Sequence, residues 1–537
     1  MNGKRAAIAA IGVITAAAAA VRLPSLRALP IFGDEAIFLR LAGIIRAEPL
    51  QQLWSPLRAP SAPLHPWLLA LSLPVSSDPV RSGRLLSVLC GVLLVPALAW
   101  AAWRLTGVVT TEAGRLAPAT SVAAAVLAAA SPFLVFSDRI ARVDSLFALE
   151  TALAAGLALS LAGRPSSRAA VLFGLLMGLT MLTRQAVSYP LWLLPLAACL
   201  VFPRREGMRI SRAIFVAIPV ALVLWVPMLV APGAADLATR IFHVSSSRPS
   251  LGFPDRAALV AQNAGIAGAA FWTYLTPAVC LAAVAGLAIA AAMHRRLFWF
   301  LAAWVAIVLL PPLLFAVDYF PRYALPAALP LLVAGGVAVA SAGIRWGRWL
   351  AAALLALLVG WGGKDVWRGV TDWRRWALLP LDRRQFVSGW SAGFASESTA
   401  DFLVGLSRGS PIWVILPKVS GNPSDAIWRR LDGEPDIRLF YAEDLLTRRA
   451  VTAGEPGRAR LQGDIWAGRP VETVMLDPAA SILFVSPDPV FLGRAGWAPA
   501  GDFVLARNPG ARLLARFENP RDSAGAEESA VSVFRLR

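Results

Sequence analysis

Long apolar runs recur along the chain from its start to about residue 362 and then stop. A helix of ~20 apolar residues spans the hydrocarbon core of a bilayer, so a chain with many such runs must fold in lipid. Only 16% of the residues are charged, below the ~25% of soluble domains. The sequence predicts a multi-pass helical membrane protein with about eleven transmembrane helices, at residues 6–21, 85–103, 122–136, 145–162, 171–182, 189–202, 214–230, 271–293, 297–317, 325–342 and 350–362.

Basic residues gather in short connections between these runs, for example at residues 204–212, 295–296 and 345–348. Short cytoplasmic loops carry this excess of positive charge, so these connections are predicted to be cytoplasmic. The topology accounts for the net charge of +18, and no nucleic-acid partner is expected. The external side then receives residues 22–84, 137–144, 232–262, 318–322 and everything after about residue 364.

The first apolar run has two interpretations. Basic residues followed by an Ala-rich stretch are typical of a secretory signal peptide with a small-residue cleavage site. We favour a retained first transmembrane helix, because later segments span the membrane anyway. Both interpretations place the residues that follow, including Asp34, outside.

Two adjacent carboxylates, Asp34 and Glu35, begin the stretch GDEAIFLRLAGIIRAEPL after the first apolar run. Apolar residues recur at helical spacing there, with Arg40 off the apolar face, which predicts an amphipathic helix in the membrane interface. A second interfacial helix is predicted within residues 59–74. Acids in the first turn of a helix commonly act as caps, so the pair alone favours a structural role.

A second external link, SDRIARVDSLFALE, is rich in ionisable residues. Placing ionisable residues at the membrane edge costs free energy, so they are rare there unless function requires them. Asp144 begins a helix and can also act as a cap, but two acidic external links are more than capping requires. We therefore expect Asp34 and Asp144 to meet in one cleft.

Arg184 and Arg322 break the positive-inside pattern, because each lies in a short external position. A guanidinium group matches phosphate oxygens bidentately and stays protonated, so a phosphate is the natural ligand for them. Snorkelling towards lipid head groups is the alternative for either residue alone. The two residues together favour ligand binding.

Five stretches in this order resemble the bacterial members of the GT-C glycosyltransferase superfamily: FGDEAIF, APLHPWLLAL, SDRIARVDSLFAL, LTRQAV and PRYALPAALPLL. Over about residues 1–345 the chain is similar to protein O-mannosyltransferases and lipid A aminoarabinose transferases. The resemblance implies a membrane enzyme that transfers a sugar, with inversion, from a polyprenyl-phosphate-linked donor to a lipid, glycan or protein acceptor. The implied location is the external face of the bacterial cytoplasmic membrane.

The resemblance also implies catalytic residues. Asp34 corresponds to the acid that acts as general base, Glu35 to its neighbour, and Asp144 to the acid of the second external link. Sugar transfer needs a base near the acceptor hydroxyl and positive charge near the departing phosphate. No cofactor is required; if a divalent metal ion such as Mg²⁺ or Mn²⁺ takes part, Asp34 and Asp144 are its oxygen ligands. All three cysteines lie in apolar runs, so no disulfide framework or Cys-based metal site is predicted.

Residues that contact the donor follow from the same resemblance. Arg184 and the pair Arg322 and Tyr323 correspond to positions expected to contact the carrier phosphate, and Arg139 is a further candidate. The remaining candidate substrate contacts are His65, in the stretch APLHP whose order departs from the family's pattern, and His243 and Arg248, in the predicted irregular loop 232–262.

The composition changes after the last apolar run. Residues 1–363 are assigned to the transmembrane domain, 364–380 to an interfacial linker and 381–537 to a soluble external α/β domain. Helices are predicted at 396–409 and 424–433, and strands at 411–417, 437–442, 481–487, 503–508, 512–519 and 531–537. The domain has no evident catalytic constellation, so acceptor or partner binding is its predicted role.

Two other functions stay open from the sequence. A secondary transporter places its charges in paired broken helices at mid-membrane depth. A non-catalytic membrane scaffold for envelope glycan assembly would display the C-terminal domain without needing the external acids and arginines. The notable charges lie at external helix ends, which favours the enzyme.

Overall fold

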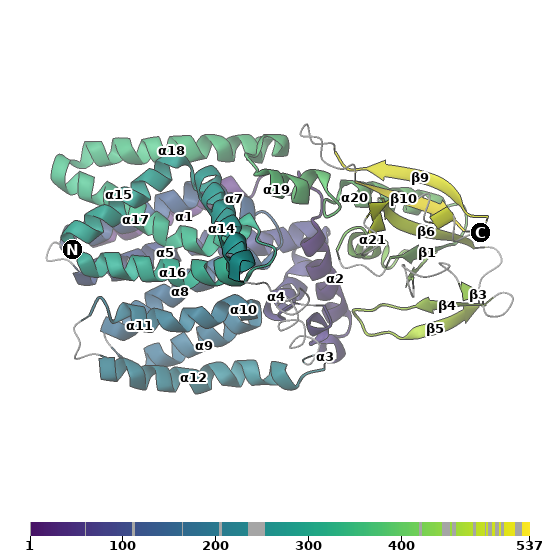
Figure 1. Ribbon diagram of the computed structural model, residues 1–537, viewed down its shortest axis with the longest axis horizontal. Helices are drawn as coiled ribbons and strands as arrows, with labels where there is room; N and C mark the ends of the chain where they lie inside the picture. Colours follow the sequence, from purple (N-terminus) through teal and green to yellow (C-terminus); the bar gives the residue numbers. More distant parts are fainter. Residues whose placement is uncertain are drawn as a thin grey trace. The chain divides into compact units, whose positions relative to one another are not determined.

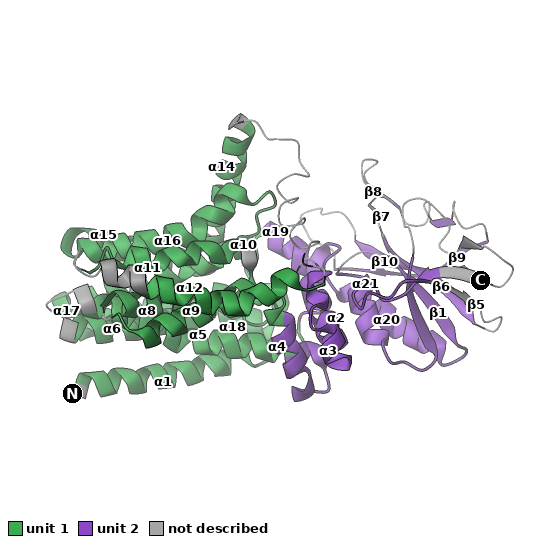
Figure 2. Ribbon diagram, turned by 90° about the horizontal axis from the view of Figure 1, so that it is seen from below, with its two compact units in different colours: residues 1–28, 61–65, 83–379 green, residues 29–60, 66–82, 380–537 purple. Residues whose placement is uncertain are grey.

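The chain forms two compact units (Figure 2). The helical unit consists of residues 1–28, 61–65 and 83–379, and the mixed unit of residues 29–60, 66–82 and 380–537. This grouping differs from the predicted domain division, because most of the first external loop falls with the C-terminal domain. The computed structural model describes residues 2–59, 61–109, 113–163, 165–202, 207–232, 234, 253–417, 421–442, 452–453, 458–475, 480–488, 490–491, 497–499, 504–505, 510–520 and 529–536.

The helical unit is built mainly from long helices (Figure 1). Shorter helical segments are α7 (Pro132–Ser137), α10 (Gln185–Ser188), η3 (Tyr189–Leu193), α11 (Leu194–Ala198), η5 (Phe271–Leu275), η6 (Pro321–Ala324) and η7 (Trp373–Arg375). The longer helices are α1 (Asn2–Arg22), α5 (Pro79–Val109), α6 (Ala113–Ala130), α8 (Val143–Gly163), α9 (Ser167–Thr183), α12 (Gly207–Val230), α14 (Phe253–Ala270), α15 (Pro277–Met293), α16 (Arg295–Phe315), α17 (Leu325–Trp346) and α18 (Arg348–Thr371).

The predicted multi-pass helical membrane fold is confirmed. Within the described residues, seven helices are long and apolar enough to cross a bilayer, and a pair bent by 107°, Asp255–Leu275 with Pro277–Met293, can form an eighth span. The other predicted runs, 122–136, 171–182 and 189–202, lie on or overlap shorter apolar helices. Every predicted run thus contains helix, whereas the number of spans is not established.

Small residues allow the helices of this unit to approach closely, as is usual inside membranes. A methyl group on Gly174 of α9 would overlap the backbone of Ala217 in α12, and one on Gly286 of α15 would overlap that of Ala334 in α17. The prediction of an irregular loop over 232–262 is wrong in part, since α14 begins at Phe253.

The mixed unit contains a sheet of eight described strands in the order β3-β4-β2-β1-β6-β10-β9, with β5 beside β4. β1 is parallel to β2 and β6, whereas β10 is antiparallel to β6 and β9. A separate pair joins β7 (Val490–Phe491) to β8 (Trp497–Ala498). The strands are β1 (Ile412–Leu416), β2 (Ile437–Tyr441), β3 (Thr452–Ala453), β4 (Arg458–Gln462), β5 (Val471–Met475), β6 (Ser481–Asp488), β9 (Arg512–Glu518) and β10 (Ala530–Arg535).

Both faces of the central strand β1 are covered. Ile412, Val414 and Leu416 join one apolar cluster with α20 (Phe394–Ser407) and α21 (Ser424–Leu431), while Trp413 and Ile415 join a second on the other face. A parallel strand buried on both sides reads as a continuous apolar run, which is why IWVIL could be predicted as a strand.

Most predicted elements of the C-terminal domain are confirmed. Both helices are present, as are strands at 411–417, 437–442, 481–487, 512–519 and 531–537. Only 504–505 of the predicted strand 503–508 are described, and they are helical. The remaining helices of the mixed unit are α3 (Pro49–Gln52), η1 (Ser55–Leu57), η2 (Leu73–Val75), α19 (Pro380–Arg383) and η8 (Arg384–Ser388), together with α2 (Gly33–Ala47) and α4 (Leu64–Ser72), the two helices expected in the first external loop.

Candidate active site

Asp34 and Glu35 occupy the first turn of α2 but differ in their surroundings. Glu35 is completely buried, and its carboxylate accepts a 2.9 Å hydrogen bond from the backbone N–H of Phe32. This hydrogen bond caps the start of α2 and gives Glu35 a structural role. Asp34 is half-buried, so part of the residue is open to solvent.

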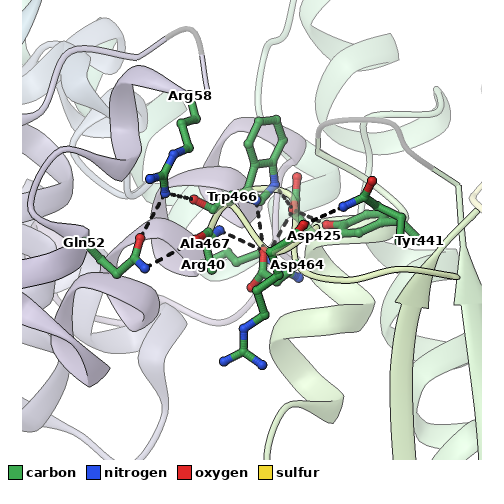
Figure 3. A network of polar contacts seen from close by, with 10 residues as sticks. Arg40, Gln52, Arg58, Asp425, Tyr441, Asp464, Trp466 and Ala467 are labelled. Carbon is green, nitrogen blue, oxygen red and sulfur yellow. Dashed lines mark hydrogen bonds and ion pairs between the residues drawn. The ribbon is translucent and has the colours of Figure 1, made fainter. Parts of the chain in front are cut away.

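Arg40 is buried, although the helical spacing placed it off the apolar face of α2. Its Nη2 atom lies 2.8 Å from Asp464 and its Nε atom 3.6 Å from Asp425 (Figure 3). Its guanidinium carbon lies 3.9 Å from the ring centroid of Trp428. The expectation that Arg40 faces away from buried surface is therefore wrong. The face of α2 that carries Arg40 packs against α21 rather than being solvated.

Asp425 is the centre of this buried network. It accepts hydrogen bonds from the Trp466 indole at 2.7 Å, the Tyr441 hydroxyl at 3.3 Å and the Gly421 backbone N–H at 2.6 Å (Figure 3). Burial raises the pKa of the Asp425 carboxyl, whereas the Arg40 guanidinium and these hydrogen bonds lower it. Burial and the Asp425 charge raise the pKa of Tyr441 well above its usual value.

In the helical unit, Asp144 joins the beginning of α8 to two arginines. Its Oδ2 atom lies 2.8 Å from Nη2 of Arg142, and its Oδ1 atom accepts a 3.0 Å hydrogen bond from Nη1 of Arg184. Asp144 and Arg142 are buried, while 22% of the Arg184 side chain is exposed. The Arg184 guanidinium is therefore oriented by a buried carboxylate and still has donors available for a ligand.

Aromatic rings bring Arg322 into the same group. The guanidinium carbon of Arg184 lies 5.1 Å from the Tyr323 ring centroid, and that of Arg322 lies 5.5 Å from the same ring and 4.3 Å from that of Phe320. The Arg322 charge also acts on the Asp144 carboxylate. The structure thus brings together the predicted residues Asp144, Arg184, Arg322 and Tyr323 in one unit.

A cavity of ≈ 300 Å³ opens beside this group. Arg184 and Tyr323 line it together with apolar side chains of α8, α16 and α17, among them Phe147, Pro312 and Phe315. Pro311 and Pro312 lie inside α16 and also border the cavity. Proline interrupts the hydrogen bonding of its own helix, because it lacks an N–H and its ring crowds the preceding turn. The sequence did not single out these lining residues, since they read as an ordinary apolar run.

Arg139 and Asp138 have partners within the protein. Arg139 donates to the backbone carbonyls of Arg22 at 2.8 Å and Ser25 at 3.0 Å, and Asp138 pairs with Arg22 at 2.8 Å. Burial raises the pKa of Asp138, and burial with the charges of Arg84 and Arg22 lowers the pKa of Arg139 to about 10. These contacts tie the end of α1 to the second external link and give Arg139 a structural role.

The histidine candidates receive no support from geometry. His65 lies in the first turn of α4 and is 2% exposed. His243 and Arg248 lie outside the described residues. Their assignment as substrate contacts stays a prediction, as does the meeting of Asp34 with Asp144.

The metal-ligand prediction does not fit Asp144. Both of its carboxylate oxygens are engaged by guanidinium groups, Oδ1 by Arg184 and Oδ2 by Arg142. Across the described part of the chain, no three His, Cys, Asp or Glu residues are grouped so as to hold an ion. Two adjacent cations oppose the binding of a third positive charge.

Residues 60–230 match the family model described as dolichyl-phosphate-mannose-protein mannosyltransferase. No protein of curated function matches the chain. The fold is similar to that of ArnT from Cupriavidus metallidurans bound to undecaprenyl phosphate, with 16% identity, 97% of each chain covered and a TM-score of 0.55. The Archaeoglobus fulgidus oligosaccharyltransferase tethered to an acceptor peptide is 14% identical over 76% of this chain and 61% of that chain, with a TM-score of 0.50.

These matches bear out the resemblance found in the sequence. The ArnT match extends over nearly the whole length of both chains. The structure of ArnT in the apo state matches in the same way, with a TM-score of 0.56. The mannosyltransferase model covers the region that carries α4 to α12, including the link with Asp144 and the end of α9 with Arg184. Together the family model over residues 60–230 and the matched structures show that the chain has the fold of the GT-C membrane glycosyltransferases.

Proposed function

We propose that this protein transfers a sugar from a polyprenyl-phosphate-linked donor to an acceptor at the external face of the cytoplasmic membrane. The observation that carries the proposal is the cavity beside Arg184, whose walls are apolar except for that guanidinium and Tyr323. A polyprenyl phosphate has the same division, with one strongly anionic group on an apolar chain. Arginine pairs with phosphate oxygens through a planar fork of donors.

The comparisons support this donor class. The ArnT structure similar to this chain is bound to undecaprenyl phosphate, and the matching family model is described by a dolichyl-phosphate-mannose donor. Both lipids are polyprenyl phosphates.

The proposed reaction proceeds in one displacement with inversion. Asp34 takes the proton from the acceptor hydroxyl as that oxygen attacks the anomeric carbon, and the bond between this carbon and the phosphate oxygen breaks. Arg184 and Arg322 stabilise the negative charge that develops on the departing phosphate. Asp144 acts as a positioning residue for Arg184, and Glu35 caps α2. We leave Arg139 out of the phosphate site, because its donors bind backbone carbonyls.

The proposal is tested with the purified full-length protein in lipid nanodiscs and a panel of radiolabelled polyprenyl-phosphate sugars. We expect sugar release with at least one donor, and a loss of about 10²- to 10⁴-fold in turnover for Asp34→Asn, the usual range for removing a general base. Asp78→Asn is the matched control, since Asp78 is an acid of the same loop that caps the start of α5. Near-normal turnover of Asp34→Asn would refute the base assignment.

A further inference from the structure

The chain segment that leads into Asp34 has no regular structure and is held by the C-terminal domain. The backbone N–H of Ile31 donates to Oε1 of Glu397 at 3.2 Å, and its carbonyl accepts from Nδ2 of Asn422 at 3.1 Å. The N–H of Gly33 donates to the carbonyl of Ser391 at 3.0 Å. A segment outside helices and sheets needs partners for its buried polar groups, and here residues about 360 to 390 positions away in the sequence supply them.

Close packing restricts the same segment. The rings of Phe32 and Phe386 lie 4.6 Å apart between centroids. Gly393 packs so tightly that a methyl group there would overlap the carbonyl oxygen of Ile31. Gly421 has φ of +88°, and a Cβ atom on it would lie 3.3 Å from the carbonyl oxygen of Gly33. The segment therefore has little freedom to shift towards the domain.

The buried network around Arg40 adds a second fixed point about two turns further along α2. Arg40 pairs with Asp425 and Asp464 (Figure 3), and its guanidinium group stacks on Trp428. A segment fixed before the first turn and a side chain fixed after it together determine both the position of the helix start and its rotation.

Asp34 is the residue beside these fixed points that stays partly exposed to solvent. Ile31, Phe32 and Gly33 before it and Glu35 after it are all buried, whereas Asp34 is half-buried. A domain that served only to bind acceptors would have no need to engage the backbone on the approach to this carboxylate.

We propose that the C-terminal domain is a clamp that positions Asp34 for catalysis, through Ser391, Gly393, Glu397 and Asn422. The inference rests on the proposed function, in which Asp34 is the general base. The four clamp residues are positioning residues, because they act through residues 31–33 and not on the substrate. A base must stand within hydrogen-bond reach of its proton in a near-attack geometry, and the clamp sets that geometry.

Gly393→Ala is the most direct test. It adds one methyl group against the Ile31 carbonyl at a residue whose φ of −94° suits alanine, so the expected effect is displacement of the segment without backbone strain at residue 393. Gly405→Ala is the control within α20, the helix that Gly393 precedes as N-cap residue, because an added methyl group on Gly405 meets nothing within 4 Å. Asn422→Ala removes the donor to Ile31 without adding volume.

Turnover is measured for each full-length variant in nanodiscs. We expect Gly393→Ala to lower kcat by about 10- to 100-fold, as misplacement by about 1 Å does, and Gly405→Ala to leave it unchanged. The decisive comparison is with Asp34→Asn: if Gly393→Ala acts through Asp34, the double variant Asp34→Asn/Gly393→Ala is no slower than Asp34→Asn alone. An equal fractional loss in both backgrounds, or no loss at all, would overturn the clamp.

Hydrogen exchange separates this inference from the proposed base. In Gly393→Ala and Asn422→Ala the amides of residues 31–33 should exchange at least tenfold faster, with unchanged protection of β1 as evidence that the domain is folded. Unchanged exchange at residues 31–33 would exclude the clamp whatever Asp34 does. Full turnover of Asp34→Asn would instead refute the base, and the exchange data alone would then decide whether the segment is clamped.

Discussion

The Nη1 atom of Arg184 donates a 3.0 Å hydrogen bond to Oδ1 of Asp144, which joins the end of α9 to the first turn of α8. Arg184 is the C-cap residue of α9, and it also lines the cavity with Tyr323. The carboxylate, itself held by Arg142, fixes one side of the guanidinium and leaves the other directed to the cavity. This division of donors gives each residue of the group a separate, measurable role.

Arg184→Gln should weaken donor binding. A hydrogen bond to a charged group contributes about 1.5–3 kcal/mol, so the KM for the polyprenyl-phosphate donor should rise about 10- to 150-fold. Arg184→Lys keeps the charge but loses the fork of donors, so its donor KM should lie between the values for Arg184→Gln and wild type. Arg168→Gln is the control at the other, exposed end of α9. Equal donor KM in Arg184→Gln and wild type would contradict a phosphate contact.

Tyr323 is expected to act through its ring. Both Arg184 and Arg322 face that ring, at 5.1 and 5.5 Å from its centroid, and a partly desolvated cation–π contact contributes about 0.5–2 kcal/mol. Tyr323→Phe should therefore keep the donor KM within twofold of wild type, whereas Tyr323→Ala should raise it at least several-fold. If the two variants are equally impaired, the hydroxyl and not the ring is the functional group.

Much of the helical unit could be predicted from the sequence, because length and apolarity alone determine which segments enter a membrane. Arg184 and Arg322 were recognisable as basic residues in short links that the charge pattern predicts to be external. Asp144 could be connected with them only by order along the chain; the ion pair that joins it to Arg184 depends on how α8 packs against α9.

The mixed unit shows where sequence reasoning fails. The periodicity of α2 marks Arg40 as polar and therefore exposed, yet Asp425, Trp428 and Asp464 create a buried site for it. No local pattern reveals these three partners of Arg40, because they lie about 400 residues further along the chain. Strand β4, RARLQ, was not predicted for a related reason. It pairs with β5, but its sequence contains no apolar run that would indicate a strand.

Removing one member of the Arg40 network should destabilise the mixed unit strongly. Arg40→Met leaves the buried carboxylate of Asp425 without its cation, a change that costs about 3–5 kcal/mol in comparable buried pairs. The free energy of opening of β1, measured by native-state hydrogen exchange, should fall by that amount. Arg430→Met is the control, because Arg430 is 45% exposed in its pairs with Asp401 and Glu434 and such pairs contribute about 0–1 kcal/mol. A loss for Arg40→Met no larger than this control would show that the pair is not stabilising.

Tyr441 should make the mixed unit sensitive to alkali. Its pKa is raised well above the ordinary value, so the folded state keeps the phenol proton that the unfolded chain releases near pH 10. The stabilising contribution is complete below pH 10 and is lost as the pH rises above it, at about 1.4 kcal/mol per pH unit. Hydrogen exchange of β1 between pH 9 and 11, corrected for intrinsic rates, should show this slope in wild type and a smaller slope in Tyr441→Phe. Identical slopes would mean that Tyr441 is not protected from ionisation.

Transfer is expected to survive removal of divalent metal ions. The argument comes from Asp144, whose two oxygens are held at 3.0 Å by Arg184 and at 2.8 Å by Arg142; an ion at this carboxylate would have to displace a guanidinium and meet the charges of both. Turnover in excess EDTA should stay within twofold of the untreated enzyme, and added Mg²⁺ or Mn²⁺ should not raise it. The same metal-removal and metal-addition measurements on Arg142→Gln are a sharper test, because this substitution removes the guanidinium that engages Oδ2 of Asp144 and one opposing charge. A metal requirement in the unaltered enzyme would mean that the arginines do not carry the phosphate charge by themselves.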